Sequence, residues 1–275
     1  MTTLDNRPSA PPSMRQMLNK VPEVTLYFWI IKVLATTVGE TAADYLNTTL
    51  NYGLTKTTYI MAAILVAVLV VQFRARKYVP GIYWLAVVLI SIVGTLITDN
   101  LADNYNWSFL KCTVVFAICL AATFAAWYAS EKSLSIHTIT TTKREAFYWL
   151  TILFTFALGT AAGDLVAEKM SLGYWKSALL FAAIIAIIGL ACFKAGLNAV
   201  LGFWMAYIVT RPLGASLGDY LSQAKIGSVG EDGSVTQGGG LNLGTTVTSA
   251  IFLSAILIVV LYISNAQKRR PAVAS

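Results

Sequence analysis

The segment YWLTILFTFALGTAAGD, residues 148–164, joins an apolar run to a Gly-x-x-x-Gly pair and a terminal aspartate. Three other segments align with it without a gap: FWIIKVLATTVGETAAD at 28–44, YWLAVVLISIVGTLITD at 83–99 and FWMAYIVTRPLGASLGD at 203–219. Each reads aromatic-Trp-x9-Gly-x4-Asp, and successive tryptophans are 55, 65 and 55 residues apart. This spacing predicts four tandem copies of one unit, arranged as a duplicated pair.

The composition predicts an all-α, polytopic integral membrane protein. Of 275 residues, 57% are hydrophobic and only 12% are charged, against about 25% charged in soluble domains. Apolar runs of about 20 residues, long enough to cross a bilayer, recur along the chain, and the alternation typical of barrel strands is missing. We predict eight transmembrane helices, two in each repeat, at 22–46, 56–74, 81–102, 108–129, 145–168, 174–193, 197–222 and 243–265. Repeats with an even number of helices share one orientation, so their axis is expected along the membrane normal.

Basic residues indicate the orientation. Thirteen Lys and Arg fall on the side of both termini and five on the other, which predicts cytoplasmic termini. We divide the chain into a disordered cytosolic tail (1–20), a first membrane half with repeats 1 and 2 (21–138), a second half with repeats 3 and 4 (139–265), and a cytosolic basic tail (266–275). The Gly-rich connection before the last helix is expected to be a mobile or irregular flap.

Four aspartates, one in each repeat, are the main candidate ligands: Asp44, Asp99, Asp164 and Asp219. Each follows its tryptophan by 15 residues, about 22 Å along a helix at about 1.5 Å per residue, so all four lie at one depth. Neighbouring acids and hydroxyls extend this set: Glu40, Asp103, Glu168, Thr95 and Thr160. Around a common axis such acids would bind cations or hold protons, whereas the alternative is that they only terminate helices at the outer boundary.

The ligand type favours hard cations. Carboxylates and hydroxyls suit manganese, magnesium, calcium or protons better than copper or zinc, and the four repeat aspartates are the candidate metal ligands. The single histidine, His137, falls in a predicted cytosolic loop, and the three cysteines fall inside apolar runs without a metal spacing. No cofactor is predicted.

Two basic residues, Lys32 and Arg211, lie inside predicted spans and are candidate charge partners of the acids. Arg211 precedes Pro212 and lies one turn below the depth of Glu40, so we expect it to pair with Glu40 or a neighbouring aspartate. Lys32 could instead extend its amine to the cytoplasmic interface.

The glycines and tryptophans of the repeat each allow two interpretations. The glycines stand in small-x-x-x-small pairs that either let helices approach closely or mark points where helices unwind: Gly39, Gly94, Gly159, Gly163, Gly214 and Gly218. The tryptophans lie near the predicted cytoplasmic interface and would either anchor the helices there or form a gate: Trp29, Trp84, Trp149 and Trp204.

Four tandem two-helix units, each with Trp near the start of its first helix, resemble the DUF347 repeat family of bacterial membrane proteins. The resemblance covers roughly residues 21–265. It implies a multi-pass protein of the bacterial cytoplasmic (inner) membrane, and it implies no reaction and no substrate.

Together these features predict a transporter or exporter of a cation, coupled to protons or to the membrane potential. The alternatives are a proton-coupled transporter of a small organic or lipid-like solute, and a non-transporting membrane scaffold or sensor. Because the chain contains no Ser/His pair, zinc signature or activated cysteine, we do not expect an enzyme. The expected partners are the lipid bilayer, a small cation or proton and a second copy of the chain, and no nucleic acid, since topology explains the net charge of +7.

Overall fold

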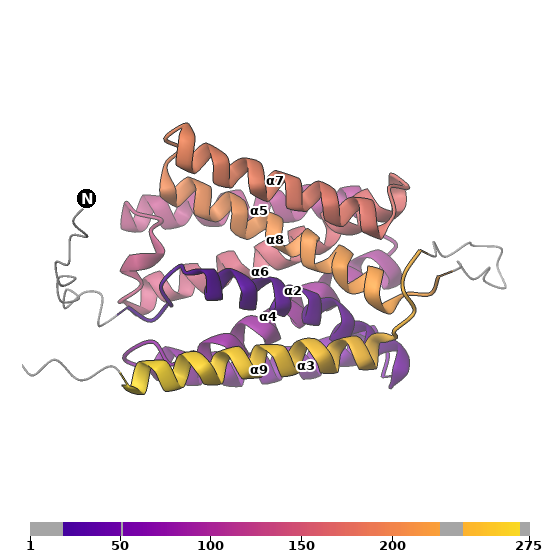
Figure 1. Ribbon diagram of the computed structural model, residues 1–275, viewed down its shortest axis with the longest axis horizontal. Helices are drawn as coiled ribbons and strands as arrows, with labels where there is room; N and C mark the ends of the chain where they lie inside the picture. The colour runs from indigo at the N-terminus through magenta and orange to yellow at the C-terminus, as the bar shows by residue number, and fades with distance from the viewer. Residues whose placement is uncertain (1–18, 51, 226–238, 270–275) are drawn as a thin grey trace, which may run out of the picture.

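The computed structural model describes residues 19–50, 52–225 and 239–269, and these form helices and short connections without a β-strand (Figure 1). The long helices are α2 (Leu26–Asp44), α3 (Leu54–Arg74), α4 (Pro80–Asp99), α5 (Phe109–Glu131), α6 (Thr142–Asp164), α7 (Tyr174–Lys194), α8 (Ala199–Ser222) and α9 (Thr245–Arg269). Three π-helices, η1 (Tyr45–Thr49), η2 (Asn100–Asn104) and η4 (Leu165–Lys169), and a 3-10 turn, η3 (Ile136–Thr138), join some of them.

The all-α class is confirmed for the described residues, and the long apolar helices fit a membrane protein. The long helices coincide with the eight predicted ranges, and seven of them are long and apolar enough to cross a membrane. Helix α2 is not among the seven, and its 19 residues include Lys32, Glu40 and Asp44. The charged residues therefore gather in the helix that opens the first repeat.

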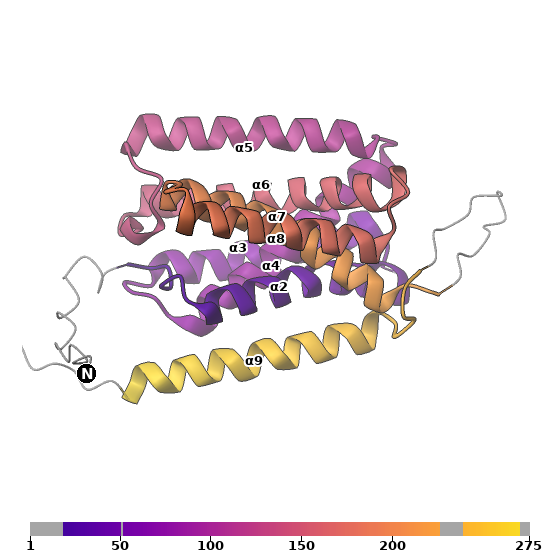
Figure 2. The same cartoon turned by 45° about the horizontal axis from the view of Figure 1, so that its top comes forward.

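The helices form two concentric layers. Helix α2 packs against α4 and α8, and α6 packs against the same two helices, so α2, α4, α6 and α8 close an inner ring. The outer helices α3, α5, α7 and α9 pack on this ring, and Figure 2 shows α5 and α9 on opposite flanks of it. The inner helices are largely buried, whereas the outer helices expose most of their apolar side chains, as a lipid-facing layer should.

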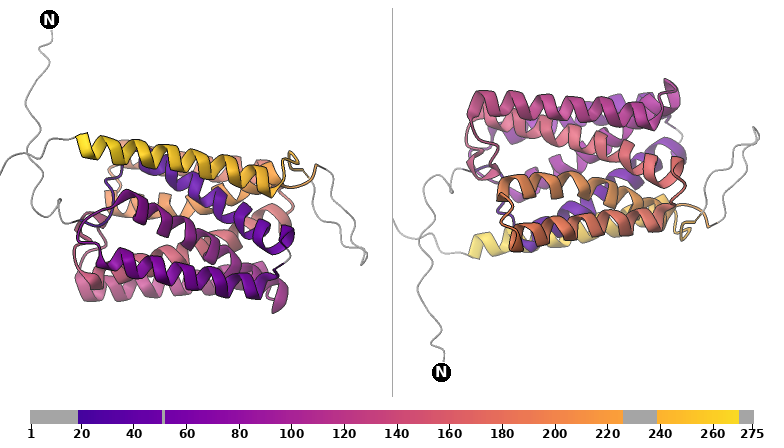
Figure 3. Two further views of the ribbon diagram at one scale, coloured as in Figure 1. Left: turned by 90° about the horizontal axis from the view of Figure 1, so that it is seen from below. Right: turned by 90° about the horizontal axis from the view of Figure 1, so that it is seen from above.

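All four inner helices run in the same direction, as the parallel repeat predicts (Figures 1 and 3). We call the end at which they begin the Trp end, because Trp29, Trp84, Trp149 and Trp204 lie there, and the opposite end, with the four repeat aspartates, the Asp end. Each outer helix packs on the inner helix of the next repeat: α3 on α4, α5 on α6 and α7 on α8. The last helix, α9, packs on α2, so the chain closes the ring on its own first repeat.

The repeat glycines set the close spacing of the inner ring. A Cβ added at Gly39 would collide with Ser91, one at Gly94 would lie 2.7 Å from the Cβ of Phe156, and one at Gly214 would collide with Thr36. Each of these partners stands three residues before the glycine of the neighbouring repeat. The same contact therefore recurs around the ring, and small residues are required because the backbones nearly touch.

These glycines do not break the helices. Gly39, Gly94, Gly159 and Gly214 all lie inside continuous α-helix, so the packing interpretation describes them and the unwinding interpretation does not. Departure from α-geometry begins later, directly after the aspartates, where three inner helices pass into π-helices.

The predicted tails need one correction. Residues 1–18 and 270–275 lie outside the described residues, as do 226–238 of the predicted flap. Asn19 and Lys20, which we assigned to the disordered tail, are instead buried, and the Lys20 amine lies 2.7 Å from Glu145 Oε2. The prediction failed at these two residues because it rested on the polar, Pro-rich composition of the segment, which does not show that Lys20 has a buried carboxylate to pair with. Residues 266–269 likewise continue α9.

Candidate functional site

The four repeat aspartates all lie at the Asp end of the inner ring. Asp44, Asp99 and Asp164 are the last residues of α2, α4 and α6, and each is followed at once by a π-helix. Asp219 lies in the last turn of α8, which ends at Ser222 without a π-helix. A π-helix is uncommon and is found mainly at functional sites, so its repetition at this position singles out the aspartates.

The acids converge. Glu40 interacts electrostatically with each of the four repeat aspartates. Carboxylate oxygens of Glu40, Asp164 and Asp219 all lie within 4.8 Å of one another. The ring therefore brings acids of repeats 1, 3 and 4 into one cluster, which we call the acid cluster (Glu40, Asp164 and Asp219), with Asp44 and Asp99 beside it.

Protein donors leave most of these carboxylates unbound. Gln223 Nε2 donates to Asp44 Oδ2 at 3.3 Å. Within the described residues, the carboxylates of Asp99, Asp164 and Asp219 accept no hydrogen bond and form no ion pair. Asp219 is only 7% exposed. Because a buried carboxylate is costly without a partner, such acids need a proton or a bound cation.

Arg211 lies against the acid cluster on its Trp-end side. Its guanidinium is fully buried and lies 2.6 Å from Glu40 Oε2, which confirms the pairing expected from the sequence. Arg211 Nη1 donates to the Thr36 carbonyl at 2.7 Å and Nη2 donates to Thr160 Oγ1 at 2.7 Å and to Thr95 Oγ1. One side chain of repeat 4 thus binds all three other repeats.

The partners of Arg211 are equivalent positions of the repeat. Glu40, Thr95 and Thr160 each follow the motif glycine, and repeat 4 has Ala215 there. The guanidinium, with its five donors in a planar fork, suits acceptors that approach from several sides. Arg211 therefore closes the axis of the ring directly beside the acids.

Lys32 is the second buried cation found in the inner ring, and no described acid forms an ion pair with it. Its side chain is fully buried, and its amine forms no hydrogen bond with any described residue. The amine lies 4.1 Å from the ring centroid of Phe156 and 4.2 Å from that of Tyr207, a cation–π arrangement. The amine does not reach the surface, so the interfacial alternative does not describe it.

Aromatic side chains fill the Trp end. Trp84, Trp149 and Trp204 are buried, Trp29 is partly exposed, and the hydroxyls of Tyr83 and Tyr148 lie 2.5 Å apart inside the ring. The indole of Trp204 donates to the Leu134 carbonyl at 2.9 Å, and that of Trp84 donates to Tyr78 at 3.1 Å. The axis thus passes from a polar Asp end to a closed aromatic Trp end.

The remaining candidates lie at the rim. Asp103 in η2 is exposed, and Glu168 in η4 is half-buried and bonded to Tyr174 at the start of α7. A Cβ added at Gly163 would lie 3.5 Å from the Pro212 Cα, an ordinary contact, and one at Gly218 would lie 3.2 Å from the Glu40 Cβ, tight but short of the collisions at the other four repeat glycines. Sequence reasoning missed Tyr174 and Gln223. Gln223 stands one turn after Asp219 and could have been found by that spacing, whereas nothing in the repeat signals Tyr174.

Comparison with known proteins supports the repeat. No curated protein and no solved structure matched the chain. The family model described as "Repeat of Unknown Function (DUF347)" matches four regions, at 27–78, 82–133, 147–196 and 202–269. Each region begins close to the aromatic-Trp pair of one repeat and contains its glycine and aspartate. Because these matches cover most of the chain, it belongs to the DUF347 repeat family.

Proposed function

We propose that the acid cluster binds a cation and that the protein carries this cation across the membrane. The observation that carries the proposal is the meeting of Glu40, Asp164 and Asp219 from three repeats, with ligand oxygens within 4.8 Å of one another. Intramembrane acids that face the interior of a helix bundle usually serve ion or proton pathways. Sites at the interface of structural repeats are typical of secondary transporters.

Charge and spacing favour a hard divalent cation such as manganese. Three ionised carboxylates and the Arg211 guanidinium leave two negative charges, which one divalent cation balances. Such an ion lies about 2.0–2.6 Å from each ligand oxygen, which fits oxygens that are within 4.8 Å of one another. Asp44 and Asp99 would then be the groups that hold protons, which supplies a means of proton coupling.

Arg211 supplies a reason for the cation to change the conformation. The guanidinium is already paired with the Glu40 carboxylate, so an incoming cation competes with Arg211 for that carboxylate. A ligand shifts a conformational equilibrium only by its differential affinity for the two states. Loss of the Arg211–Glu40 pair would weaken the bonds that tie repeat 4 to the other three, and so favour a state with an open axis.

The setting of this proposal is a multi-pass protein of the bacterial cytoplasmic membrane. The excess of basic residues near both termini favours cytoplasmic termini, which puts the Trp end inside and the Asp end outside. We infer transport rather than catalysis, because the hydroxyls beside the acids, those of Thr95 and Thr160, accept from Arg211 and have no general base among their hydrogen-bond partners in the described residues.

Flux into reconstituted vesicles tests the proposal. Mn²⁺ entry, followed with a trapped metal-sensitive dye, should fall at least tenfold in Asp164→Asn and Asp219→Asn. Asp103→Asn, which changes an exposed acid at the same end, is the matched control and should retain wild-type flux. Wild-type flux in the two cluster variants would refute a cation site, and a change in thermal stability alone would favour a scaffold or sensor.

A further inference from the structure

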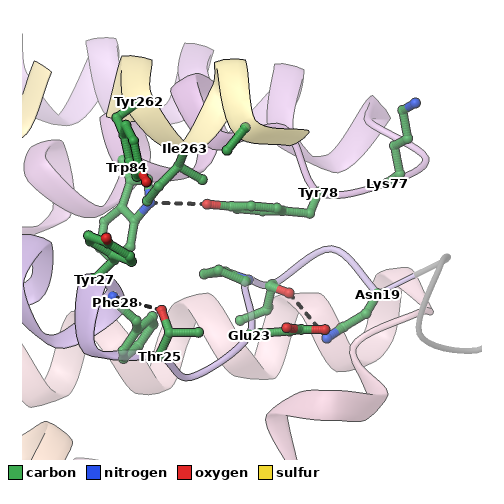
Figure 4. A pocket seen from close by; sticks show the side chains of 13 residues that line it. Asn19, Glu23, Thr25, Tyr27, Phe28, Lys77, Tyr78, Trp84, Tyr262 and Ile263 are labelled. Carbon is green, nitrogen blue, oxygen red and sulfur yellow. Dashed lines mark hydrogen bonds between the residues drawn. The ribbon is translucent and has the colours of Figure 1, made fainter. Parts of the chain in front are cut away.

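A cavity of about 510 Å³ opens at the Trp end, at the end of the ring away from the acid cluster (Figure 4). It lies between the residues before α2, the start of α4 and the last turns of α9. Its volume falls within the range of about 300–1,000 Å³ typical of small-molecule sites. Because it shares no residue with the acid cluster, it calls for a separate explanation.

The walls of the cavity are largely aromatic. Tyr78 extends across it, and the Tyr78 hydroxyl accepts a hydrogen bond from Trp84 Nε1 at 3.1 Å, which holds the two rings in place. Tyr27 and Tyr262 form the wall between α2 and α9, with ring centroids 5.6 Å apart. Tyr27 and Tyr262 are 44% and 57% exposed, so neither side chain is covered by the rest of the protein. Aromatic faces carry negative potential and attract organic cations.

The polar groups opposite these rings are acceptors. Figure 4 shows the Glu23 carboxylate beside Asn19, on the side of the cavity facing Tyr78. Asn19 is 9% exposed and donates its amide to the Val21 carbonyl at 3.1 Å, which leaves its buried Oδ1 without a donor among the described residues. The Glu23 carboxylate, on an exposed residue, fits a ligand that brings positive charge and N–H donors.

Two described lysines of the cavity wall and its border, Lys20 and Lys77, form no hydrogen bond or ion pair with the Glu23 carboxylate. Lys20 is held by Glu145 at 2.7 Å and by the Phe73 carbonyl at 3.0 Å. Lys77 lines the rim, and Figure 4 shows its amine directed away from Glu23. The cavity therefore combines aromatic faces with a negative charge that no lysine of its wall neutralises.

We propose that this cavity binds an organic ammonium group, with the Tyr78 ring beside the cation, Glu23 as its counter-charge, and Tyr27 and Tyr262 lining the rest of the cavity. The ammonium belongs either to a small soluble amine or to the headgroup of an amino lipid, since the cavity lies where the outer helix α9 ends. This inference does not depend on cation transport through the acid cluster.

Binding of choline and of ethanolammonium to the full chain tests it, in nanodiscs of phosphatidylglycerol that contain no amino lipid. Calorimetry should detect at least one of the two, with 3,3-dimethyl-1-butanol, the neutral isostere of choline, at least tenfold weaker. Glu23→Gln and Tyr78→Leu should each weaken binding about tenfold. The first removes the counter-charge of the ammonium, and the second removes an aromatic face beside it. Tyr78→Phe, which keeps the ring, and Lys77→Ala, which changes the rim, should stay within about threefold.

Nanodiscs with phosphatidylethanolamine then separate the two sources. Competition by this lipid against the soluble probe would assign the site to a headgroup, and unchanged probe affinity would assign it to a soluble amine. Absence of binding by both ammonium probes, together with no stabilisation by the lipid, would overturn the proposal. Equal binding of the neutral isostere, or full affinity in Glu23→Gln with normal thermal unfolding, would overturn it as well.

Discussion

The fourth repeat differs from the first three at both positions that face the axis. Three residues before its glycine it has Arg211, where the others have Thr36, Ser91 and Phe156. After its glycine it has Ala215, where the others have Glu40, Thr95 and Thr160. Its inner helix also continues as α-helix past Asp219, whereas the other three pass into π-helices directly after their aspartates.

The axis explains this asymmetry. Only one side chain can occupy the centre of a four-helix ring, and four arginines there would repel one another in a dry environment. One repeat therefore donates hydrogen bonds at the axis, through Arg211. The other three repeats accept them, through Glu40, Thr95 and Thr160. The duplication built a nearly four-fold ring, and the fourth copy departs from it at the axis.

Removal of Arg211 should have the largest effect on the ring. Arg211→Ala leaves Glu40 buried and unpaired and should lower the free energy of unfolding by about 3–5 kcal/mol. The free energy of unfolding of Arg211→Lys should lie between those of the wild type and Arg211→Ala. A lysine amine keeps the charge but lacks the planar fork with which the guanidinium reaches its acceptors. Thermal unfolding in detergent measures both, and adding Glu40→Gln to Arg211→Ala should recover part of the loss. An unchanged Tm in Arg211→Ala would show that the repeats do not depend on this contact.

A methyl group at the ring glycines should have the next largest effect. Gly214→Ala forces a Cβ into Thr36 and close to the Thr37 backbone, and should destabilise by about 1–3 kcal/mol through overpacking. Gly163→Ala, where the nearest atom lies 3.5 Å away, is the matched control and should be nearly neutral. Equal Tm values for the two variants would contradict the close approach of α8 and α2.

The two buried cations of the inner ring, Lys32 and Arg211, should behave in opposite ways. Lys32→Met removes an amine without a hydrogen-bond partner and should be neutral or stabilising by about 1 kcal/mol, unlike Arg211→Met, because desolvation of the charge is relieved. Denaturation of the two variants side by side checks this. A loss as large as that of Arg211→Met would mean that Lys32 has a partner in the folded protein.

The smallest effect concerns the closure of the outer layer. Ser249 Oγ of α9 donates to Thr41 Oγ1 of α2 at 2.8 Å, across the junction between the fourth and first repeats. Ser249→Ala should cost about 1 kcal/mol, the usual net value of a hydrogen bond. Ser130→Ala, in an exposed turn of α5, serves as the control with no measurable change in Tm.

Local pattern was enough to predict a large part of this protein. Gapless spacing predicted four repeats and eight helices, and a rise of 1.5 Å per residue placed the aspartates at one depth and Arg211 within reach of Glu40. These features follow from periodicity along one segment, which a sequence displays directly.

Tertiary structure alone decided which segments meet. Contacts between helices far apart in the sequence depend on how glycine surfaces pack, so the sequence did not place Thr95 and Thr160 on one guanidinium, nor α9 on α2. It also could not tell that Lys32 lies between aromatic rings, since side-chain burial in a bundle depends on the neighbouring helix. The cavity beside Trp84 could not be predicted from the sequence either. Its walls come from the start of α2 and the residues before it, the start of α4 and the last turns of α9, and only the closed ring brings these segments together.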